Sequence, residues 1–167
     1  MQADPSSNIE GLLDRADAMC AERGARLTAL RRRVLSLVLQ APAPIGAYDL
    51  LDRLREADGK AAAPPTVYRA LDFLMEQGLI HRLERLSAYI GCIGEAVPGH
   101  DHEDAHCHSA HPHRAQFLIC RQCGKAVELD DHDLARALDR AARRAGFSVG
   151  AATIEAEGLC ETCASSP

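Results

Sequence analysis

Two pairs of cysteines are the residues most able to do chemistry, and each pair has two residues between its members. The first is CRQCG, with Cys120 and Cys123, and the second is CETC, with Cys160 and Cys163. Each pair places two sulfur atoms close enough to bind one ion, and two such pairs complete the four-thiolate site typical of structural zinc. The spacing therefore predicts one structural zinc ion bound by these four cysteines.

A redox function is the alternative for a CxxC pair, which can cycle between a dithiol and a disulfide. Such a pair usually opens a helix in a thioredoxin-like βαβ unit, and the sequence shows no such unit. A permanent disulfide frame is disfavoured because the number of cysteines, seven, is odd and because the N-terminus lacks the pattern of a secretion signal. We expect a cytoplasmic protein whose thiols stay reduced.

The distribution of charge separates the two halves of the chain. Residues 1–94 hold 12 Lys and Arg and 12 Asp and Glu, whereas residues 95–167 hold 7 and 12, so the second half carries the whole net charge of −5. A neutral first half can still present one basic face to DNA. Aromatic residues make up only 4% of the chain, which leaves few side chains for stacking on single-stranded nucleic acid. Duplex DNA remains a possible partner.

The elements that must position these residues begin with helices. Apolar residues in the first 80 positions recur with helical spacing. We expect helices over about residues 9–22, from a cap at Thr28 to the break at Pro42, over about 47–57, and from Pro64 to Gly78. Residues 79–93 then have the pattern of a two-stranded hairpin. Three helices followed by a hairpin is the plan of a winged helix-turn-helix.

The second half has a different organisation. A linker rich in Gly, Pro and His spans 94–112 and separates a first domain, 1–93, from a second, 113–167. In the second domain we expect strands at 117–119, 126–129 and 148–155 and a helix at 133–145. The expected fold is therefore α+β, with a cysteine pair at each end of the second domain.

The segment PPTVYRALDFLMEQG has the pattern of a DNA-reading helix. Its apolar residues share one face, which leaves Thr66, Tyr68 and Arg69 pointing outward near the N-terminal end, where recognition helices contact bases. Arg69 can bind guanine O6 and N7, and Thr66 and Tyr68 can reach phosphates. An ordinary amphipathic helix with a solvated outer face gives the same pattern, so amphipathicity alone does not establish DNA binding.

The order of motifs resembles that of the ferric uptake regulator family, and within it the zinc uptake regulators. The resemblance is carried by RLTALRRRVL, AYDLLDRLREA, PPTVYRALDFLMEQGLIHRLE, FLICRQCGKAVEL and IEAEGLCETC, and it covers residues 9–163. It implies a dimeric transcription factor with an N-terminal winged-helix DNA-binding domain and a C-terminal dimerisation domain, which binds near-palindromic operator DNA when loaded with metal. It also implies that Tyr48 and Arg69 contact bases.

The resemblance further points to a second, regulatory zinc site at His81, Cys92, His113 and Glu128. One thiolate, two imidazoles and one carboxylate suit tetrahedral zinc, and the soft sulfur disfavours ferrous iron and manganese. The expected cofactor is therefore Zn²⁺, two per chain. The alternatives without metal binding are that Cys92 is a small, buried hydrophobic residue and that His81 is a surface residue of a strand.

The stretch GHDHEDAHCHSAHPH departs from the zinc branch because it is longer and richer in histidine, so His111 or His108 is an alternative ligand to His113. It is either a disordered insertion or a third, weaker metal site. The candidate ligands of that third site are His100, His102, His106, His108 and His111. The ferric branch commonly has a His/Asp cluster directly before the first CxxC, and the chain has Arg114-Ala115-Gln116-Phe117 there, which favours zinc over iron.

The expected function is repression of zinc-acquisition genes by a zinc-loaded dimer on double-stranded operator DNA. Asp52 and Arg55 are candidates for contacts between two dimers that bind DNA cooperatively. An iron or peroxide sensor is disfavoured by Cys92, and a zinc-storage protein would use the histidine-rich stretch and ignore DNA. A zinc hydrolase would need an open metal position, a general base and a substrate cleft; the sequence shows neither of the last two, so we expect no enzymatic activity.

Overall fold

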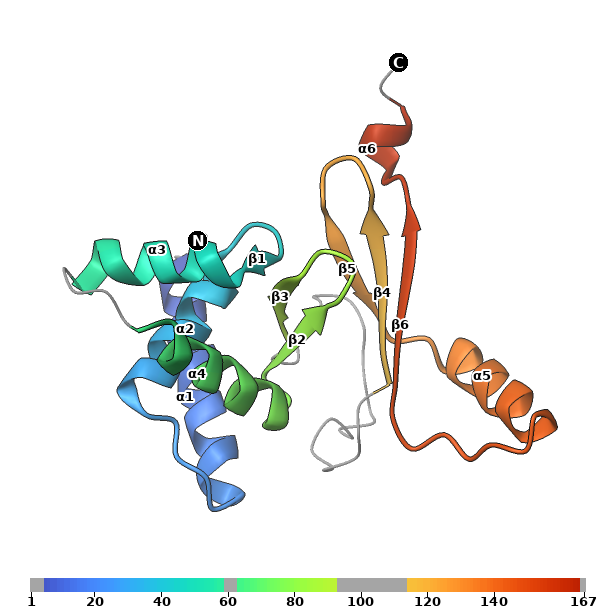
Figure 1. The fold of residues 1–167 in the computed structure, drawn as a ribbon, viewed down its shortest axis with the longest axis horizontal. Helices are drawn as coiled ribbons and strands as arrows, with labels where there is room; N and C mark the ends of the chain where they lie inside the picture. The colour runs from blue at the N-terminus through green and yellow to red at the C-terminus, as the bar shows by residue number, and fades with distance from the viewer. Residues whose placement is uncertain (1–4, 59–62, 93–113, 166–167) are drawn as a thin grey trace. The chain divides into compact units, whose positions relative to one another are not determined.

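The computed structural model describes residues 5–58, 63–92 and 114–165 (Figure 1). The chain divides into two compact units, Met1–Val97 and Pro98–Pro167, and each is described by itself. Among the described residues, no helix combines the length and apolar character needed to cross a membrane.

The first unit contains four helices and a small sheet. The helices are α1 (Pro5–Glu22), α2 (Ala29–Gln40), α3 (Ala47–Asp58) and α4 (Pro64–Glu76), and the strands are β1 (Ile45–Gly46), β2 (Ile80–Leu83) and β3 (Ala88–Gly91). The strands form an antiparallel sheet in the order β1-β3-β2. The predicted hairpin follows α4, so the winged helix-turn-helix plan is confirmed.

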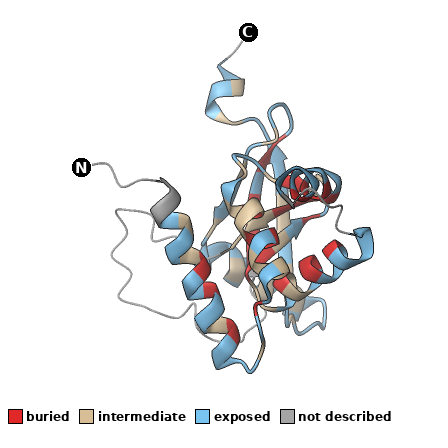
Figure 2. Cartoon of the chain, turned by 90° about the vertical axis from the view of Figure 1, so that its left-hand side faces the viewer, coloured by how far each residue is buried: buried red, intermediate tan, exposed pale blue. Residues whose placement is uncertain are grey.

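The core of the first unit is built from the apolar faces of its helices. Buried and exposed positions alternate along the helices (Figure 2), as the spacing of apolar residues in the sequence requires. The helices contribute the following buried residues, among others: Leu13, Val34, Leu35, Leu50, Leu54, Val67, Leu71 and Leu74. Burial of this stripe, rather than intrinsic helix propensity, stabilises the helices.

Side chains of α2 add two further connections within the first unit. The Arg32 guanidinium donates to Glu10 and Asp14 of α1, at 2.9 and 2.7 Å. The Arg31 guanidinium lies 3.5 Å from the ring centroid of Phe73 on α4, in a cation–π contact. The predicted cap at Thr28 is wrong in one respect, since Thr28 occupies the cap position but its side chain makes no capping hydrogen bond.

The second unit is a three-stranded sheet with a crossover helix. Its elements are β4 (Arg114–Cys120), β5 (Ala126–Leu129), α5 (His132–Arg144), β6 (Ala152–Gly158) and the short α6 (Glu161–Ala164). The strand order is β5-β4-β6, with β4 antiparallel to β5 and parallel to β6. The parallel pair requires a long connection, which α5 supplies.

Burial in the second unit is concentrated on its central strand. Ala115, Phe117 and Ile119 of β4 are each at most 3% exposed, and they share one face of the sheet because strand side chains alternate. Helix α5 contains no buried residue. The third strand lies at 152–158 rather than at the predicted 148–155, because its position is set by its pairing with β4 and not by its own apolar pattern.

Candidate metal centres and DNA-reading surface

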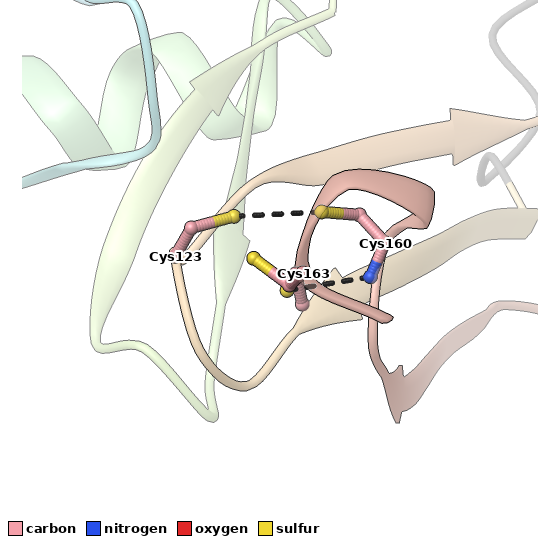
Figure 3. A group of neighbouring side chains, drawn as sticks. Cys123, Cys160 and Cys163 are labelled. Carbon is pink, nitrogen blue, oxygen red and sulfur yellow. Dashed lines mark hydrogen bonds between the residues drawn. The ribbon is translucent and has the colours of Figure 1, made fainter. Parts of the chain in front are cut away.

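The four CxxC cysteines meet at one edge of the second sheet. Strand β4 ends at Cys120 and its parallel neighbour β6 ends at Gly158, with these two residues paired in register. Both cysteine pairs therefore leave the sheet at the same edge. The four sulfur atoms all lie within 4.8 Å of one another, and the cluster is drawn in Figure 3.

The separation of the sulfurs fits a tetrahedral zinc ion. Cys123 Sγ and Cys160 Sγ are 3.8 Å apart, which is about the edge of a tetrahedron whose metal–sulfur distance is about 2.3 Å. A disulfide would need about 2.05 Å, and the six cysteines of the described residues are all free. The donor set and its geometry thus suit a structural metal ion and do not match a disulfide pair.

The backbone around the cluster holds the sulfurs in place. The Cys160 N–H donates to Cys120 Sγ at 3.4 Å. The Gly124 N–H donates to the Cys120 carbonyl at 2.9 Å, and Gly124 has φ of +72°, a conformation that suits glycine at the end of the CRQCG turn. Backbone hydrogen bonds and the left-handed conformation of Gly124 therefore hold the turn that carries Cys120 and Cys123.

Two thiols of the cluster, Cys120 and Cys163, have pKa values shifted in opposite directions. Backbone N–H groups of Cys123, Cys160 and Gln122 lower the pKa of the Cys120 thiol to about 6. The pKa of Cys163 is raised to about 12, first by its hydrogen bond with the Cys160 side chain and then by burial. Four thiolates cannot be crowded together without a compensating charge, so full deprotonation of this cluster requires a cation.

Two of the predicted regulatory ligands lie together on the wing, the hairpin formed by β2 and β3. His81 is on β2 opposite Ile90, and Cys92 directly follows β3, where its N–H donates to the Leu79 carbonyl at 2.9 Å. The register makes His81 and Cys92 diagonal neighbours on one face of the hairpin. A ring nitrogen of His81 and the Cys92 sulfur lie within 4.8 Å of each other. Two ligands of different chemical type are thus side by side.

The remaining predicted ligands belong to other parts of the chain. Glu128 lies on β5 in the second unit and is exposed. His113 lies outside the described residues, as do the linker histidines His100, His102, His106, His108 and His111. The choice among His113, His111 and His108 therefore stays a prediction.

The predicted DNA-contacting side chains are exposed on the first unit. Thr66, Tyr68 and Arg69 lie in the N-terminal half of α4 and face solvent, whereas Val67 and Ala70 between and beside them are buried. The first turn of α4 contains no acidic residue, so the helix N-terminus, which favours anions, is not screened by a local carboxylate. Tyr48, in the first turn of α3, is 78% exposed.

The structure also shows exposed apolar residues that were not predicted. Leu118 and Val127 are paired across β4 and β5 and are 48% and 43% exposed. Phe147, after α5, is 71% exposed. The sequence signal was present in the run Phe117-Leu118-Ile119, in which every residue is apolar although a sheet with one solvated face would alternate.

Comparison with known proteins adds independent information. The Ferric uptake regulator family model matches residues 22–157. The chain is 40% identical over 157 residues to the zinc uptake regulation protein of Escherichia coli strain K12, covering 94% of this chain and 84% of that protein. It is 31% identical over 142 residues to the zinc uptake regulation protein of Mycobacterium tuberculosis strain H37Rv, covering 85% and 97%.

The solved structures agree with the sequence comparison. The chain resembles a zinc uptake regulator complexed with zinc and DNA, with 38% identity and a TM-score of 0.78, over 93% of this chain and 95% of that one. The family match spans parts of both units, from the last residue of α1 into β6, and includes the first cysteine pair. The chain therefore belongs to the ferric uptake regulator family, and the two relatives named above, at 40% and 31% identity, are zinc uptake regulation proteins.

Proposed function

We propose that this protein is a zinc-responsive transcriptional regulator, mainly a repressor, that binds palindromic operator DNA as a zinc-loaded dimer and controls zinc-acquisition genes. The observation that carries the proposal is the 40% identity to a zinc uptake regulation protein over 94% of the chain. A regulator of this kind is not an enzyme, and it acts in the cytoplasm, where thiol ligands stay reduced.

Residues 1–93 form the DNA-binding domain of this proposal. Arg69 reads guanine from the exposed N-terminal half of α4, Thr66 and Tyr68 contact phosphates, and Tyr48 contacts a base from the start of α3. The exposure of all four side chains supports these roles. In a dimer, two such helices about 34 Å apart would enter successive turns of one duplex face.

The proposal assigns two zinc ions to each chain. Cys120, Cys123, Cys160 and Cys163 hold the structural ion, which their geometry supports. The regulatory ion is held by His81, Cys92, His113 and Glu128. The short distance between His81 and Cys92 supports the two ligands that the hairpin contributes. Zinc supplies the positive charge that lets thiolates and a carboxylate share one site.

Regulation follows from where the regulatory ligands lie in the chain. Two belong to the DNA-binding domain and two to the domain at 113–167, so joint ligation restrains the hinge at 94–112. Shifting a two-state equilibrium from 1:99 to 99:1 needs about 5.5 kcal/mol, which is within the range of a four-ligand zinc site. The linker histidines, as a third and weaker site, would adjust this response.

The second domain provides the dimer interface in this proposal. Its exposed apolar pair, Leu118 and Val127, and the absence of buried residues on α5 support a surface that a second copy covers. Contacts between two dimers on DNA would involve α3, where Asp52 and Arg55 are exposed and form an ion pair of 3.1 Å within the helix.

The test is fluorescence anisotropy on a duplex from the organism's own zinc-importer promoter, with free zinc buffered over several decades and salt held fixed. We expect the wild type to bind only above a threshold of free zinc. Cys92→Ala should lose the threshold, and Arg69→Ala should weaken binding at every zinc level. Arg26→Ala, at an exposed position of the first unit to which no DNA, zinc or dimer contact is assigned, is the matched arginine control. DNA binding that ignores zinc in wild type and Cys92→Ala alike would contradict the proposal.

A further inference from the structure

The wing hairpin has two faces with different contents. His81 and Cys92 lie on one face, as the register shows. Ile80, Tyr89 and Gly91 lie on the other, because neighbouring residues of a strand point to opposite sides. Ile80 and Tyr89 belong to the hydrophobic core of the first unit. The face with the metal ligands also carries the buried residues Leu83 and Ala88, and the other face packs on the helices through Ile80 and Tyr89.

The point of closest approach between hairpin and helices is Gly91, the residue directly before Cys92. A Cβ atom at Gly91 would lie only 2.6 Å from Leu39 Cδ2 and 3.7 Å from Leu39 Cγ on α2. Side-chain carbons in contact stand about 3.5–4.0 Å apart. The glycine thus leaves a hole that the Leu39 side chain enters.

Backbone conformation does not require glycine at this position. Gly91 is not among the positive-φ residues of the described chain, and it lies within β3, paired with Ile80. A larger residue would be acceptable to the strand itself. The only obstacle to one is the Leu39 side chain.

Helix α2, which carries Leu39, is held by side-chain contacts with α1 and α4. Arg32 ties it to α1 through Glu10 and Asp14, and Arg31 lies over Phe73 of α4. On its other edge, β3 pairs with β1, where Ile45 faces Tyr89. β1 therefore holds the first two residues of β3, Ala88 and Tyr89, whereas the end of β3 at Gly91 is paired with Ile80 of β2 and contacts Leu39 of α2.

We propose that Leu39 and Gly91 are positioning residues for the regulatory metal site: the leucine seated in the glycine hole fixes the end of β3 and so sets where the Cys92 sulfur stands relative to His81. The inference rests on the proposed function, since it concerns the same site. It makes the zinc affinity of that site depend on a contact that no ligand takes part in.

A size swap between the two positions tests the contact. Gly91→Leu fills the hole and displaces the strand, so we expect zinc affinity at the regulatory site to fall by about tenfold or more, as supporting residues of metal sites do. The double variant Leu39→Ala/Gly91→Leu moves the leucine to the other partner and should restore most of the affinity. Gly11→Leu is the control, because no atom lies within 4 Å of a Cβ there.

Two readouts separate positioning from general stability. Zinc affinity is measured by competition with a chelator on protein that keeps its structural zinc. Cobalt(II) is then loaded into the second site, where the Cys92 thiolate gives a charge-transfer absorption that Gly91→Leu should weaken or shift. The thermal stability of each variant is recorded, and a loss of stability with an unchanged cobalt spectrum and zinc affinity would overturn the inference.

The remaining outcomes are also decisive. A swap variant that binds zinc no better than Gly91→Leu would overturn the inference, as would a Gly91→Leu protein equal to the wild type. If Gly91→Leu does not fold, the double variant is compared with Leu39→Ala, which lacks the leucine at both positions. Equal zinc affinities of these two proteins would overturn the inference, because the leucine at position 91 would then have no effect. A Cys92→Ala protein that keeps its second zinc and its zinc-dependent DNA binding would instead contradict the proposed function.

Discussion

The two units of this chain are stabilised in different ways. Among the described residues, the first contributes 21 buried hydrophobic residues and the second only four, Ala115, Phe117, Ile119 and Cys120. In the second unit, α5 and α6 contain no buried residue at all. The first unit therefore has a core of its own, whereas the second has little more than one face of one strand.

This difference explains why the cysteine cluster is in the second unit. A domain that buries little apolar surface needs another source of stability, such as a metal ion or an oligomer. The four sulfurs join the ends of β4 and β6, and the exposed pair Leu118 and Val127 offers a surface to a second copy. The first unit needs neither to form its core.

The largest effect should come from removing the structural ion. Cys123→Ser, or chelation of the wild type, should unfold the second unit, because a structural zinc contributes on the order of 10 kcal/mol to folding. Hydrogen exchange read by mass spectrometry should show loss of protection in β4 to β6 with protection retained in α2 and α4. Equal loss of protection from hydrogen exchange in both units would contradict the view that only the second unit depends on the metal ion.

The converse substitution is in the core of the first unit. Leu71, on α4, is completely buried, and Leu71→Ala should cost about 2–5 kcal/mol of unfolding free energy. Denaturant unfolding of the first unit should shift, while the zinc content of the cysteine cluster stays at the wild-type level. A loss of that zinc would show that the two units are not independent in stability.

A smaller effect is expected at the exposed apolar pair. Leu118→Asp places a charge on the surface proposed for the dimer and should weaken association by roughly 2 kcal/mol or more. Sedimentation at several concentrations without DNA measures this, with Tyr48→Asp, at an exposed position of the first unit, as the matched variant. A dimer unchanged by Leu118→Asp would place the interface on another surface.

The smallest effect should be a gain in stability at Gln116. This residue is 3% exposed; its amide nitrogen donates to the Asp131 carbonyl at 3.0 Å, while its Oε1 is buried without a hydrogen-bond partner in the described structure. Gln116→Leu should stabilise the second unit by about 1 kcal/mol, since it removes an unsatisfied polar atom. Gln116→Glu should instead destabilise it by burying a charge, and thermal melts of the two variants should therefore move in opposite directions.

The helices and the hairpin could be predicted because their signals are local. The spacing of Leu50 and Leu54, or the Pro64-Pro65 opening of α4, is visible in a short window. The two-residue strand β1 and the position of β6 could not, because each is defined by its partner strand. The cysteine cluster was predictable from spacing, since few other uses of two CxxC pairs fit a reduced thiol.

The contact between Leu39 and Gly91, like β1 and the position of β6, could not be predicted from a short window of sequence. Neither residue is unusual in the sequence, and they become related only when the hairpin folds back on α2. The closeness of His81 and Cys92 could be proposed from a family resemblance, but their place on one face depends on the exact hairpin register. Pairing of distant segments is the information that a single sequence carries least openly.

The parallel pairing of β4 with β6 also sets an order of events during synthesis. The first unit needs no residue beyond the wing to complete its core, so it can fold while the ribosome is still making the rest of the chain. The second unit cannot close its cysteine cluster until Cys160 and Cys163 have emerged, about 40 residues after Cys120. During that interval a folded DNA-binding module is followed by a strand that still awaits both its metal ion and its parallel neighbour.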